Sequence, residues 1–392
     1  MIELKGSISS KKMSLLSFFT MFVIGTDTFV VAPLLPTLAN EFQINLDISG
    51  WMVSAYALGY AVFALFTGPF SDKHDRRTIL LTGLIGFSIT TALCGLSYSF
   101  WTMILFRFLS GICAAFVSPQ IWASIPILVE KENIVKIMGS ASAGLAAAQL
   151  AGIPIGSFLA DISWHIPFYA ISLSTVFLWW LLFRNFPSIP YNSDITDNKS
   201  NFLSPYKEVL DNTKLKYFLL AYLIFQTGNF ASFSFFGAWL YKDYGLGISS
   251  IGIAMIFVGL GFMIGSFFGN IIIKLLGIPR SFFYGFIIFT ILYIALPFSP
   301  NLYISIFTLS IIMLVAGFMF PLFMTTLQMQ ATTARGTVSA LANTAMYIGT
   351  FVGGIVGGVL LNYFIGFFGI SLFTVIAYLI SMYIYGKAGA FK

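Results

Sequence analysis

Residues 281–334 read SFFYGFIIFTILYIALPFSPNLYISIFTLSIIMLVAGFMFPLFMTTLQMQATTA and contain no Asp, Glu, Lys or Arg. The hydrocarbon core of a bilayer is about 30 Å thick, and about 20 apolar residues in an α-helix cross it. This stretch is therefore long enough to cross a membrane twice. We expect the turn between the two crossings at Ser299-Pro300-Asn301, because Pro and Asn are typical turn residues.

Residues 336–386 form a second uncharged stretch, with a turn expected near residues 362–366. Of all 392 residues, 58% are hydrophobic and 9% are charged, whereas about a quarter of the residues of a soluble domain are charged. The charged residues are bunched, and the intervals between the bunches predict the spans. The sequence thus predicts an all-α integral membrane protein of twelve transmembrane helices. We expect them at residues 13–36, 50–70, 79–98, 101–126, 137–160, 166–186, 217–240, 248–273, 282–298, 302–326, 337–361 and 366–386.

The basic residues predict the orientation of these helices. If the N-terminus is cytoplasmic, 18 of the 20 Lys and Arg residues fall in cytoplasmic segments, and of the other two Lys242 is external and Arg107 lies in a span. Cytoplasmic loops are enriched in Lys and Arg, so both chain ends are expected inside. The net charge of +6 is then a topology signal and does not support nucleic-acid binding. We expect a monomer in the lipid bilayer of a bacterial cytoplasmic membrane.

Residues 187–215 differ from the rest because they are polar, charged and rich in Ser, Asn and Pro. We interpret them as a cytoplasmic linker between an N-terminal six-helix bundle, residues 1–186, and a C-terminal six-helix bundle, residues 216–392. Glycines in the two halves also repeat at a shift of 197 positions. Together with the linker, this register predicts two pseudo-symmetric bundles with a substrate site between them near the middle of the membrane. The shift places Gly139, Gly152 and Gly156 on Gly336, Gly349 and Gly353.

The loop after the second span, residues 68–77, reads GPFSDKHDRR. It resembles the signature loop of the major facilitator superfamily, written G-x-L-x-D-[RK]-x-G-R-[RK]. The resemblance implies a conformational latch, in which the Asp pairs with a basic side chain or caps a helix. The alternative is a solvated basic loop that follows the charge rule for cytoplasmic segments. The matching residues are Gly68, Asp72, Lys73, Arg76 and Arg77, and the departures are Phe70 and Asp75.

Two further motifs resemble those of the drug:proton antiporter branch of that superfamily. Residues 107–115 (RFLSGICAA) are similar to its basic motif in the fourth span, and residues 152–156 (GIPIG) to its antiporter motif in the fifth. The two glycines of the second motif lie on one helix face, and the proline between them loosens the backbone. A plain helix-packing motif is the other interpretation. His165 stands where exporters commonly have Arg, so no role of that Arg is carried over. The residues of the second motif are Gly152, Pro154 and Gly156.

Asp27 is the one acidic residue deep in a predicted span, and no Asp or Glu follows Asp243. A charge at that depth costs roughly 2.5–3.5 kcal/mol on insertion scales. Arg107 is the candidate partner, because at about 1.5 Å of rise per residue the two differ in depth by one to two helical turns. If protons move through a carboxylate, that carboxylate is Asp27, since the second half offers none.

Two hypotheses are open for this pair. In the first, Asp27 alternates between a proton and either Arg107 or a substrate, because removal from water favours a neutral acid and a close guanidinium favours a carboxylate. In the second, the pair is static and only neutralises two buried charges. A variant of the static hypothesis has Arg107 extend toward the interface while Asp27 hydrogen-bonds to Thr26 or Thr28.

The other polar side chains in the spans are uncharged candidates for the substrate cavity. Each can orient a ligand or form a hydrogen bond between helices. Cys94 and Cys113 lie in apolar runs and are expected to pack as small hydrophobic residues. No His or Cys spacing predicts a metal site, and we expect no cofactor beyond a proton gradient. The cavity candidates are Gln120, Gln149, Gln226, Asn229, Asn343 and Tyr347.

These features favour a secondary active transporter that exports small apolar or weakly polar compounds, including drugs, in exchange for protons by alternating access. The second hypothesis is a uniporter or importer of a neutral metabolite such as a sugar or nucleobase, because the cavity has few ionisable groups. The third is a membrane receptor or enzyme. The sequence has no Gly-x-Ser-x-Gly elbow and no phosphate loop of the Walker type, so we expect no enzymatic activity.

Overall fold

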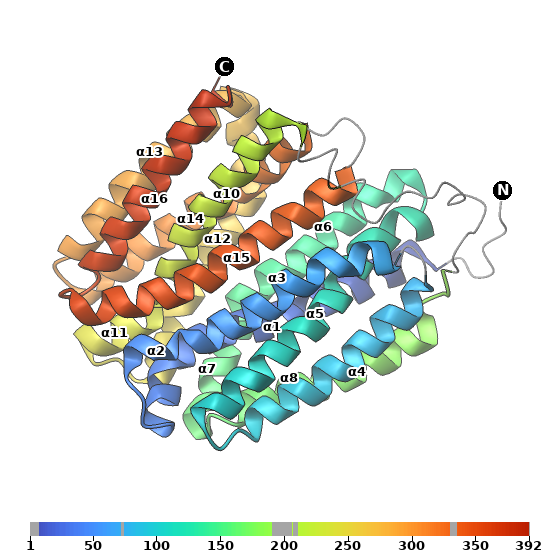
Figure 1. Cartoon of the computed structure of the whole chain (residues 1–392), viewed down its shortest axis with the longest axis horizontal. Coiled ribbons are helices and arrows are strands. Elements are labelled where there is room, and N and C mark those ends of the chain that lie inside the picture. Colours follow the sequence, from blue (N-terminus) through green and yellow to red (C-terminus); the bar gives the residue numbers. More distant parts are fainter. Residues whose placement is uncertain (1–7, 72–73, 190–205, 207–210, 330–334, 392) are drawn as a thin grey trace.

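The structure is a computed structural model that describes residues 8–71, 74–189, 206, 211–329 and 335–391. Its first half is a bundle of six spans that occupies the lower right of Figure 1. Each of the six spans is long and apolar enough to cross a membrane. The elements of this N-terminal bundle are α1 (Ser10–Glu41), α2 (Leu46–Ser49), α3 (Trp51–Ser71), α4 (Arg76–Gly95), α5 (Phe100–Leu128), α6 (Lys131–Ala147), η1 (Ala148–Gly152), α7 (Ile153–Ile162) and α8 (Ile166–Asn185).

The second half forms another bundle of six spans, at the upper left of Figure 1. Twelve helices of the described part are long and apolar enough to cross a membrane, and that part contains no strand. The predicted all-α fold of twelve spans is thereby confirmed. The elements of this C-terminal bundle are α10 (Thr213–Phe233), α11 (Phe236–Tyr244), α12 (Ile248–Leu276), α13 (Ile278–Ala295), η3 (Leu296–Phe298), α14 (Leu302–Met329), α15 (Arg335–Tyr363) and α16 (Phe368–Lys387).

The fifth span differs from the continuous α-helix predicted over residues 137–160. Its middle, η1, is a π-helix in which Ile153 N donates to Ala148 O. Pro154 follows directly at the start of α7 and has no N–H to donate, so the α-helical ladder is broken at this point. A π-helical turn inside an α-helix is often found at a functional position.

The seventh span was predicted as one helix over residues 217–240, and this is wrong in detail. The helix stops at Phe233 and restarts as α11 at Phe236. Between them Phe235 leaves helical geometry, with φ −114° and ψ 8°. Its ring, fully buried, lies against glycines of α15 and against Gly50 at the start of α3. The break therefore places an aromatic ring where the two bundles meet.

The two bundles repeat the same close helix contacts. A Cβ at Gly59 on α3 would overlap the Phe108 carbonyl oxygen on α5. A Cβ at Gly261 on α12 would overlap the Ser310 carbonyl oxygen on α14 in the same way. Each residue of the second contact stands 202 positions after its counterpart. The α3–α5 pair and the α12–α14 pair are therefore equivalent.

The glycine register predicted from the sequence also corresponds to equivalent packing. Gly152 and Gly156 lie against Thr26 and Val30 on α1. In the other bundle, Gly349 lies against Gln226 and Thr227, and Gly353 against Thr227 and Ala231, all on α10. The first helix of each bundle thus packs against the fifth through glycines in the same register.

We call outer the end of the molecule where α1 ends and inner the end where α1 begins. The bundles meet along two seams, α3 with α15 and the η1–α7 segment with α12 (Figure 1). At the outer end of the first seam, Gly50 lies against Gly354 and the Ser54 hydroxyl donates to Phe351 O at 2.8 Å. In the second, Gly259 lies against Leu150. The outer half of the interface is therefore closed.

Candidate functional site

A buried ion pair joins α1 to α5. Arg107 Nη1 lies 2.8 Å from Asp27 Oδ2, and both side chains have an exposed fraction of 0%. Arg107 Nε also donates to Met52 O at 3.4 Å. Among the described residues, Asp27 and Arg107 are the two charged side chains that are buried. The structure therefore brings together the acid and the base that the sequence singled out.

The pair is incompletely satisfied by the protein. Asp27 Oδ1 and Arg107 Nη2 are buried and have no hydrogen-bond partner. Buried polar atoms are nearly always paired, and an unpaired one costs about 1–3 kcal/mol. The arrangement thus leaves one acceptor and one donor available beside the ion pair.

Tyr56 on α3 contacts both halves of this site. The Arg107 guanidinium carbon lies 4.4 Å from the centre of the Tyr56 ring, a cation–π distance. The Tyr56 hydroxyl is hydrogen-bonded to Thr28 Oγ1 at 3.0 Å, one residue beyond Asp27 on α1. Tyr56 was not among the site residues predicted from the sequence. Tyr56 and Tyr60 are four residues apart and lie on one face of the span that neighbours the span of Arg107. This spacing could have identified Tyr56.

The C-terminal bundle adds one aromatic ring near the pair. Tyr347 on α15 stacks on Tyr60 with ring centroids 3.8 Å apart and planes 23° apart. Its ring centroid lies 6.5 Å from that of Tyr56. Tyr347 is therefore a cavity candidate that the structure places against the tyrosines beside the ion pair.

The predicted motif at residues 152–156 lies between the ion-pair helix and the other bundle. Gly152 lies against Thr26, the residue before Asp27. On its other side, the Pro154 carbonyl oxygen and Ser157 lie against Gly252 on α12. The segment therefore touches both the helix that carries the acid and a helix of the C-terminal bundle.

Two of the predicted cavity residues bond to each other inside the C-terminal bundle. Gln226 Nε2 donates to the Tyr222 hydroxyl at 2.7 Å, and Asn229 Nδ2 donates to Gln226 Oε1 at 3.4 Å. The Tyr378 hydroxyl donates to Asn229 Oδ1 at 3.4 Å. Because these amides satisfy one another, the network stabilises the packing of α10 against its neighbours.

The remaining three candidates lie in different environments. Gln120 is buried, and its amide has no protein partner. It follows Phe116 and Val117, which contact Gly83, by one helical turn, so it lies on the face of α5 that packs against α4. Gln149 is buried in η1, and its Oε1 has no partner. Asn343 is half-buried on α15, one turn before Tyr347.

The loop at residues 68–77 is described in part. Asp72 and Lys73 lie outside the described residues, and Gly68 lies in the last turns of α3. Arg76 is half-buried at the start of α4. Arg77 places its guanidinium 5.4 Å from the centre of the Phe183 ring on α8. This arginine therefore fastens the loop within its own bundle.

Asp75, which departs from the family pattern, caps α4. Its carboxylate accepts hydrogen bonds from Arg77 N at 3.1 Å and Thr78 Oγ1 at 3.3 Å. It also accepts from Ser188 Oγ and Ile189 N, both at 2.9 Å, in the segment that follows α8. The unusual Asp thus ties the loop to the beginning of the inter-bundle segment.

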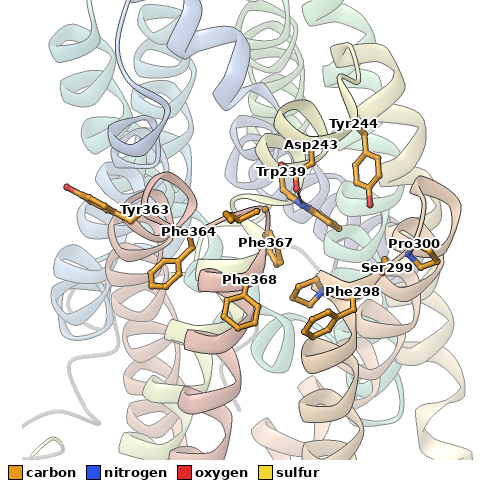
Figure 2. A pocket seen from close by; sticks show the side chains of 13 residues that line it. Trp239, Asp243, Tyr244, Phe298, Ser299, Pro300, Tyr363, Phe364, Phe367 and Phe368 are labelled. Atoms are coloured by element: carbon orange, nitrogen blue, oxygen red, sulfur yellow. Dashed lines mark hydrogen bonds between the residues drawn. The ribbon is translucent and has the colours of Figure 1, made fainter.

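A separate hollow of about 850 Å³ opens at the outer end of the C-terminal bundle (Figure 2). Trp239 and Phe367 form its buried floor, and Trp239 Nε1 donates to Asp243 Oδ2 at 2.7 Å. Exposed Phe298 and Tyr363 lie at its rim. Aromatic side chains are enriched at membrane–water interfaces, so this hollow belongs to the outer surface and not to the ion-pair site.

Cysteine and metal chemistry have no visible place in the described part of the chain. Cys94 is a buried free thiol, and Cys113 is a half-buried one whose sulfur lies against Gly86. No group of three or more His, Cys, Asp or Glu side chains gathers there in a way that could hold a metal ion. The Asp27–Arg107 pair and the tyrosines beside it therefore remain as the candidate functional groups.

Twelve spans in two equivalent bundles, with a buried ion pair beside their interface, define a secondary transporter architecture. The sequence matches the family described as Major Facilitator Superfamily over residues 17–354 and 218–390. The chain belongs to the major facilitator superfamily. Members of this family are transporters and not enzymes, and they typically need no cofactor. The protein is therefore a multi-pass membrane transporter.

Two relatives illustrate its place in the family. The chain is 47% identical to the uncharacterized MFS-type transporter YceJ of Bacillus subtilis (strain 168), with 94% of each chain covered. It is 26% identical to multidrug resistance protein 1 of the same organism, over 61% of this chain and 62% of that protein.

Solved structures show the same fold. A mutant of the nucleoside transporter NupG has a TM-score of 0.78 at 13% identity, with 97% of this chain and 99% of that chain covered. A D-xylose-proton symporter has a TM-score of 0.75 at 15% identity, with 95% and 97% covered. Identities this low establish the shared fold and leave the substrate open.

Proposed function

We propose that the chain is a proton-coupled exporter of small apolar or weakly polar compounds, with Asp27 as the proton carrier. The observation that carries this proposal is the Asp27–Arg107 pair, fully buried and 2.8 Å apart. Burying two charges costs free energy that packing with apolar residues of the same volume does not. A position that keeps such a pair in a membrane span is a functional position by default.

In the proposed cycle, Asp27 is ionised while Arg107 holds it. Protonation makes the carboxyl group neutral and weakens its attraction to the guanidinium. Arg107 then keeps its contacts with Met52 O and the Tyr56 ring, and the unpaired atoms of the site become available to a substrate. Exchange of proton for substrate on opposite sides of the membrane follows if the bundles rock about this fixed site.

Export is favoured over import by sequence similarity. Multidrug resistance protein 1 is a relative across 61% of the chain, and the tetracycline resistance protein, class B, of Escherichia coli is 33% identical over 43% of it. Drugs are therefore the first substrates to test. The cytoplasmic membrane of a bacterial cell is the proposed location, and a monomer is the proposed unit.

A uniporter or importer of a neutral metabolite is the second candidate. The observation in its favour is the uncharged polar set on the C-terminal side, where Asn343 is half-buried without a described partner. Such a transporter needs no titrating carboxylate. It therefore predicts transport that is independent of an imposed pH gradient.

We also propose that the loop at residues 68–77 sets the rate of conformational switching and that residues 187–215 link two moving units, 1–186 and 216–392. Arg76→Ala is expected to slow turnover and to leave substrate affinity nearly unchanged, because the loop is remote from the ion pair. Weakened binding at unchanged turnover contradicts this role. Single-site binding and turnover measurements separate the two quantities.

The proposed function is tested in vesicles that contain the purified chain and an imposed pH gradient. A small library of dyes, drugs, sugars and nucleobases is screened for movement against its own gradient. We expect an apolar drug or dye to be driven uphill, and the movement to stop when an ionophore collapses the pH gradient. Uphill movement that survives the ionophore, or movement of sugars alone down their gradient, contradicts proton-coupled export.

A further inference from the structure

Three tyrosines form a layered cover on the ion pair. Tyr56 lies over Arg107, Tyr60 lies one turn farther along α3, and Tyr347 stacks on Tyr60 from the opposite bundle. One turn of helix is about 5.4 Å, and α3 runs from the outer end inward, so the Tyr60–Tyr347 stack lies on the inner side of Tyr56. We call Tyr56, Tyr60 and Tyr347 the tyrosine cover.

All members of the tyrosine cover and of the ion pair are buried. The exposed fraction is 8% for Tyr347, 3% for Tyr60, 1% for Tyr56 and 0% for both members of the ion pair. Tyr347 is the layer that the opposite bundle contributes through its stack on Tyr60, and Tyr56 is the layer directly on Arg107.

The layer formed by Tyr347 belongs to the C-terminal bundle, whose described residues include no buried charged side chain. Tyr347 is carried by α15, which also meets α3 through Gly354 and the Phe351 carbonyl. A movement of α15 away from α3 therefore removes Tyr347 from Tyr60 and from the neighbourhood of Tyr56. Opening of the tyrosine cover and separation of the two bundles are therefore the same movement.

The second seam shows that the two bundles can pack together without such a ring stack. The counterparts of Tyr60 and Tyr347 at the repeat shifts of 202 and 197 positions are Phe262 and Leu150. There the bundles meet by close backbone contact, because a Cβ at Gly259 would lie 2.7 Å from Leu150 Cα. The ring stack is found on the seam that borders the ion pair.

We propose that Tyr347 is a positioning residue that keeps Asp27 closed to protons until the two bundles separate. This inference rests on the proposed proton role of Asp27 and adds the element that prevents proton leak without substrate. A coupled exporter needs such an element, because a carboxylate open to both sides dissipates the gradient. An aromatic stack contributes through its ring geometry as well as its buried area.

The test is passive proton flux into vesicles that contain the full chain and no substrate, followed with an internal pH dye. For Tyr347→Ala we expect the flux to rise about fivefold over the wild type, as removal of one aromatic pair shifts the population of separated bundles. Tyr347→Phe keeps the ring and is expected to stay at the wild-type flux. The double variant Tyr347→Ala/Asp27→Asn is expected to lose the leak, because no proton carrier is left.

Phe289→Ala is the matched control, since this ring is fully buried within the C-terminal bundle and packs on Tyr293 and Tyr378. It opens a similar hole away from the ion pair and is expected not to leak. Tyr347→Leu keeps much of the side-chain volume without the stack and replaces the Ala variant if that variant does not fold by gel filtration.

Wild-type flux in the folded Ala or Leu variant overturns the proposal, as does a leak that persists in the double variant. Failure of the proposed function itself is a separate result, namely uphill transport by Asp27→Asn alone.

Discussion

The two bundles repeat one packing scheme and differ in what they bury. In the N-terminal bundle, α3 meets α5 at Gly59, and in the C-terminal bundle α12 meets α14 at Gly261, 202 positions later. The same shift carries Arg107 to Leu309, which is fully buried. The equivalent glycine contacts of α1 and α10 make Thr227 or Gly228 the counterpart of Asp27. The charged pair thus has uncharged counterparts.

This difference indicates that a six-helix bundle of this kind can form without a buried ion pair. The C-terminal bundle closes the same helix contacts with an aromatic core, in which the Phe225 ring stacks 4.5 Å from Tyr378 and lies 4.4 Å from Phe323. Apolar packing of this kind stabilises a bundle without the desolvation cost of an ion pair. This difference supports the proposal that the pair in the N-terminal bundle serves transport.

The largest effect is expected when a charge is buried in the C-terminal bundle, whose described residues include no buried charged side chain. Leu309→Arg puts a guanidinium at a fully buried position in a half of the chain where residues 216–242 and 244–392 contain no Asp or Glu. An unpaired buried charge destabilises by about 3–5 kcal/mol. We expect a large fall in the thermal unfolding temperature in detergent.

Leu309→Met is the control for that variant, because it keeps volume and apolarity and costs less than about 1.5 kcal/mol. If Leu309→Arg is as stable as Leu309→Met, the two bundles are not as different in polarity as their buried residues indicate. The equivalence of Leu309 and Arg107 is then also in doubt.

An intermediate effect is expected from the repeated glycine contacts. Gly59→Ala and Gly261→Ala each push a Cβ into a backbone carbonyl of the neighbouring helix, that of Phe108 and that of Ser310. Overpacking of this kind costs about 1–3 kcal/mol. Thermal unfolding is expected to fall by a similar amount in both variants, since the contacts are equivalent.

Gly139→Ala is the matched control for the glycine variants, because no atom lies within 4 Å of a Cβ at that position. Replacing Gly by Ala inside a helix stabilises by about 0.5–1 kcal/mol when space allows. A loss of stability confined to one of the two bundles contradicts the repeat.

The smallest effect is expected at the loop where the bundles differ in their caps. Asp75 caps α4 with its side chain, whereas α13 in the other bundle follows Gly277, whose φ is +78°. Asp75→Gly restores the family pattern and removes the side-chain cap, a loss of about a few tenths of a kcal/mol when Gly is the replacement. We expect a slight loss of thermal stability and faster proteolysis of the segment after α8.

Asp75→Asn serves as the comparison for that variant, since Asn also caps helices well and keeps the hydrogen-bond acceptor. Stability and proteolysis like those of the wild type are expected. Equal behaviour of the Gly and Asn variants argues that the carboxylate contacts with Ser188 and Ile189 contribute nothing.

Much of the fold could be predicted because a membrane imposes a simple length and charge rule on each helix. The turn expected at Ser299-Pro300-Asn301 falls between η3 and α14. This length and charge rule contains no information about local backbone geometry. The π-helix at residues 148–152 and the break at Phe235 were therefore not predicted. Both depend on packing between bundles, which no single span encodes.

The site was predicted where charge made it conspicuous. Asp27 and Arg107 stand out in an apolar sequence, and counting residues along the spans placed them within one to two helical turns of each other in depth. The tyrosine cover does not stand out, because Tyr56, Tyr60 and Tyr347 are three among 18 tyrosines and 44 phenylalanines. Their relation depends on α3 and α15 lying side by side, a contact between halves of the chain. Pattern analysis of either half cannot supply it.

The most direct test of the central claim is uphill transport by Asp27→Asn in vesicles with an imposed pH gradient. This variant keeps size and hydrogen bonding but cannot carry a proton, and Arg107 retains Met52 O and the Tyr56 ring as partners. We expect a folded protein that exchanges substrate for substrate and no longer moves it uphill. Asp161→Asn, an exposed acid at the end of α7, is expected to transport like the wild type. Uphill transport by Asp27→Asn, or by Asp27→Asn/Arg107→Gln, contradicts the carboxylate mechanism.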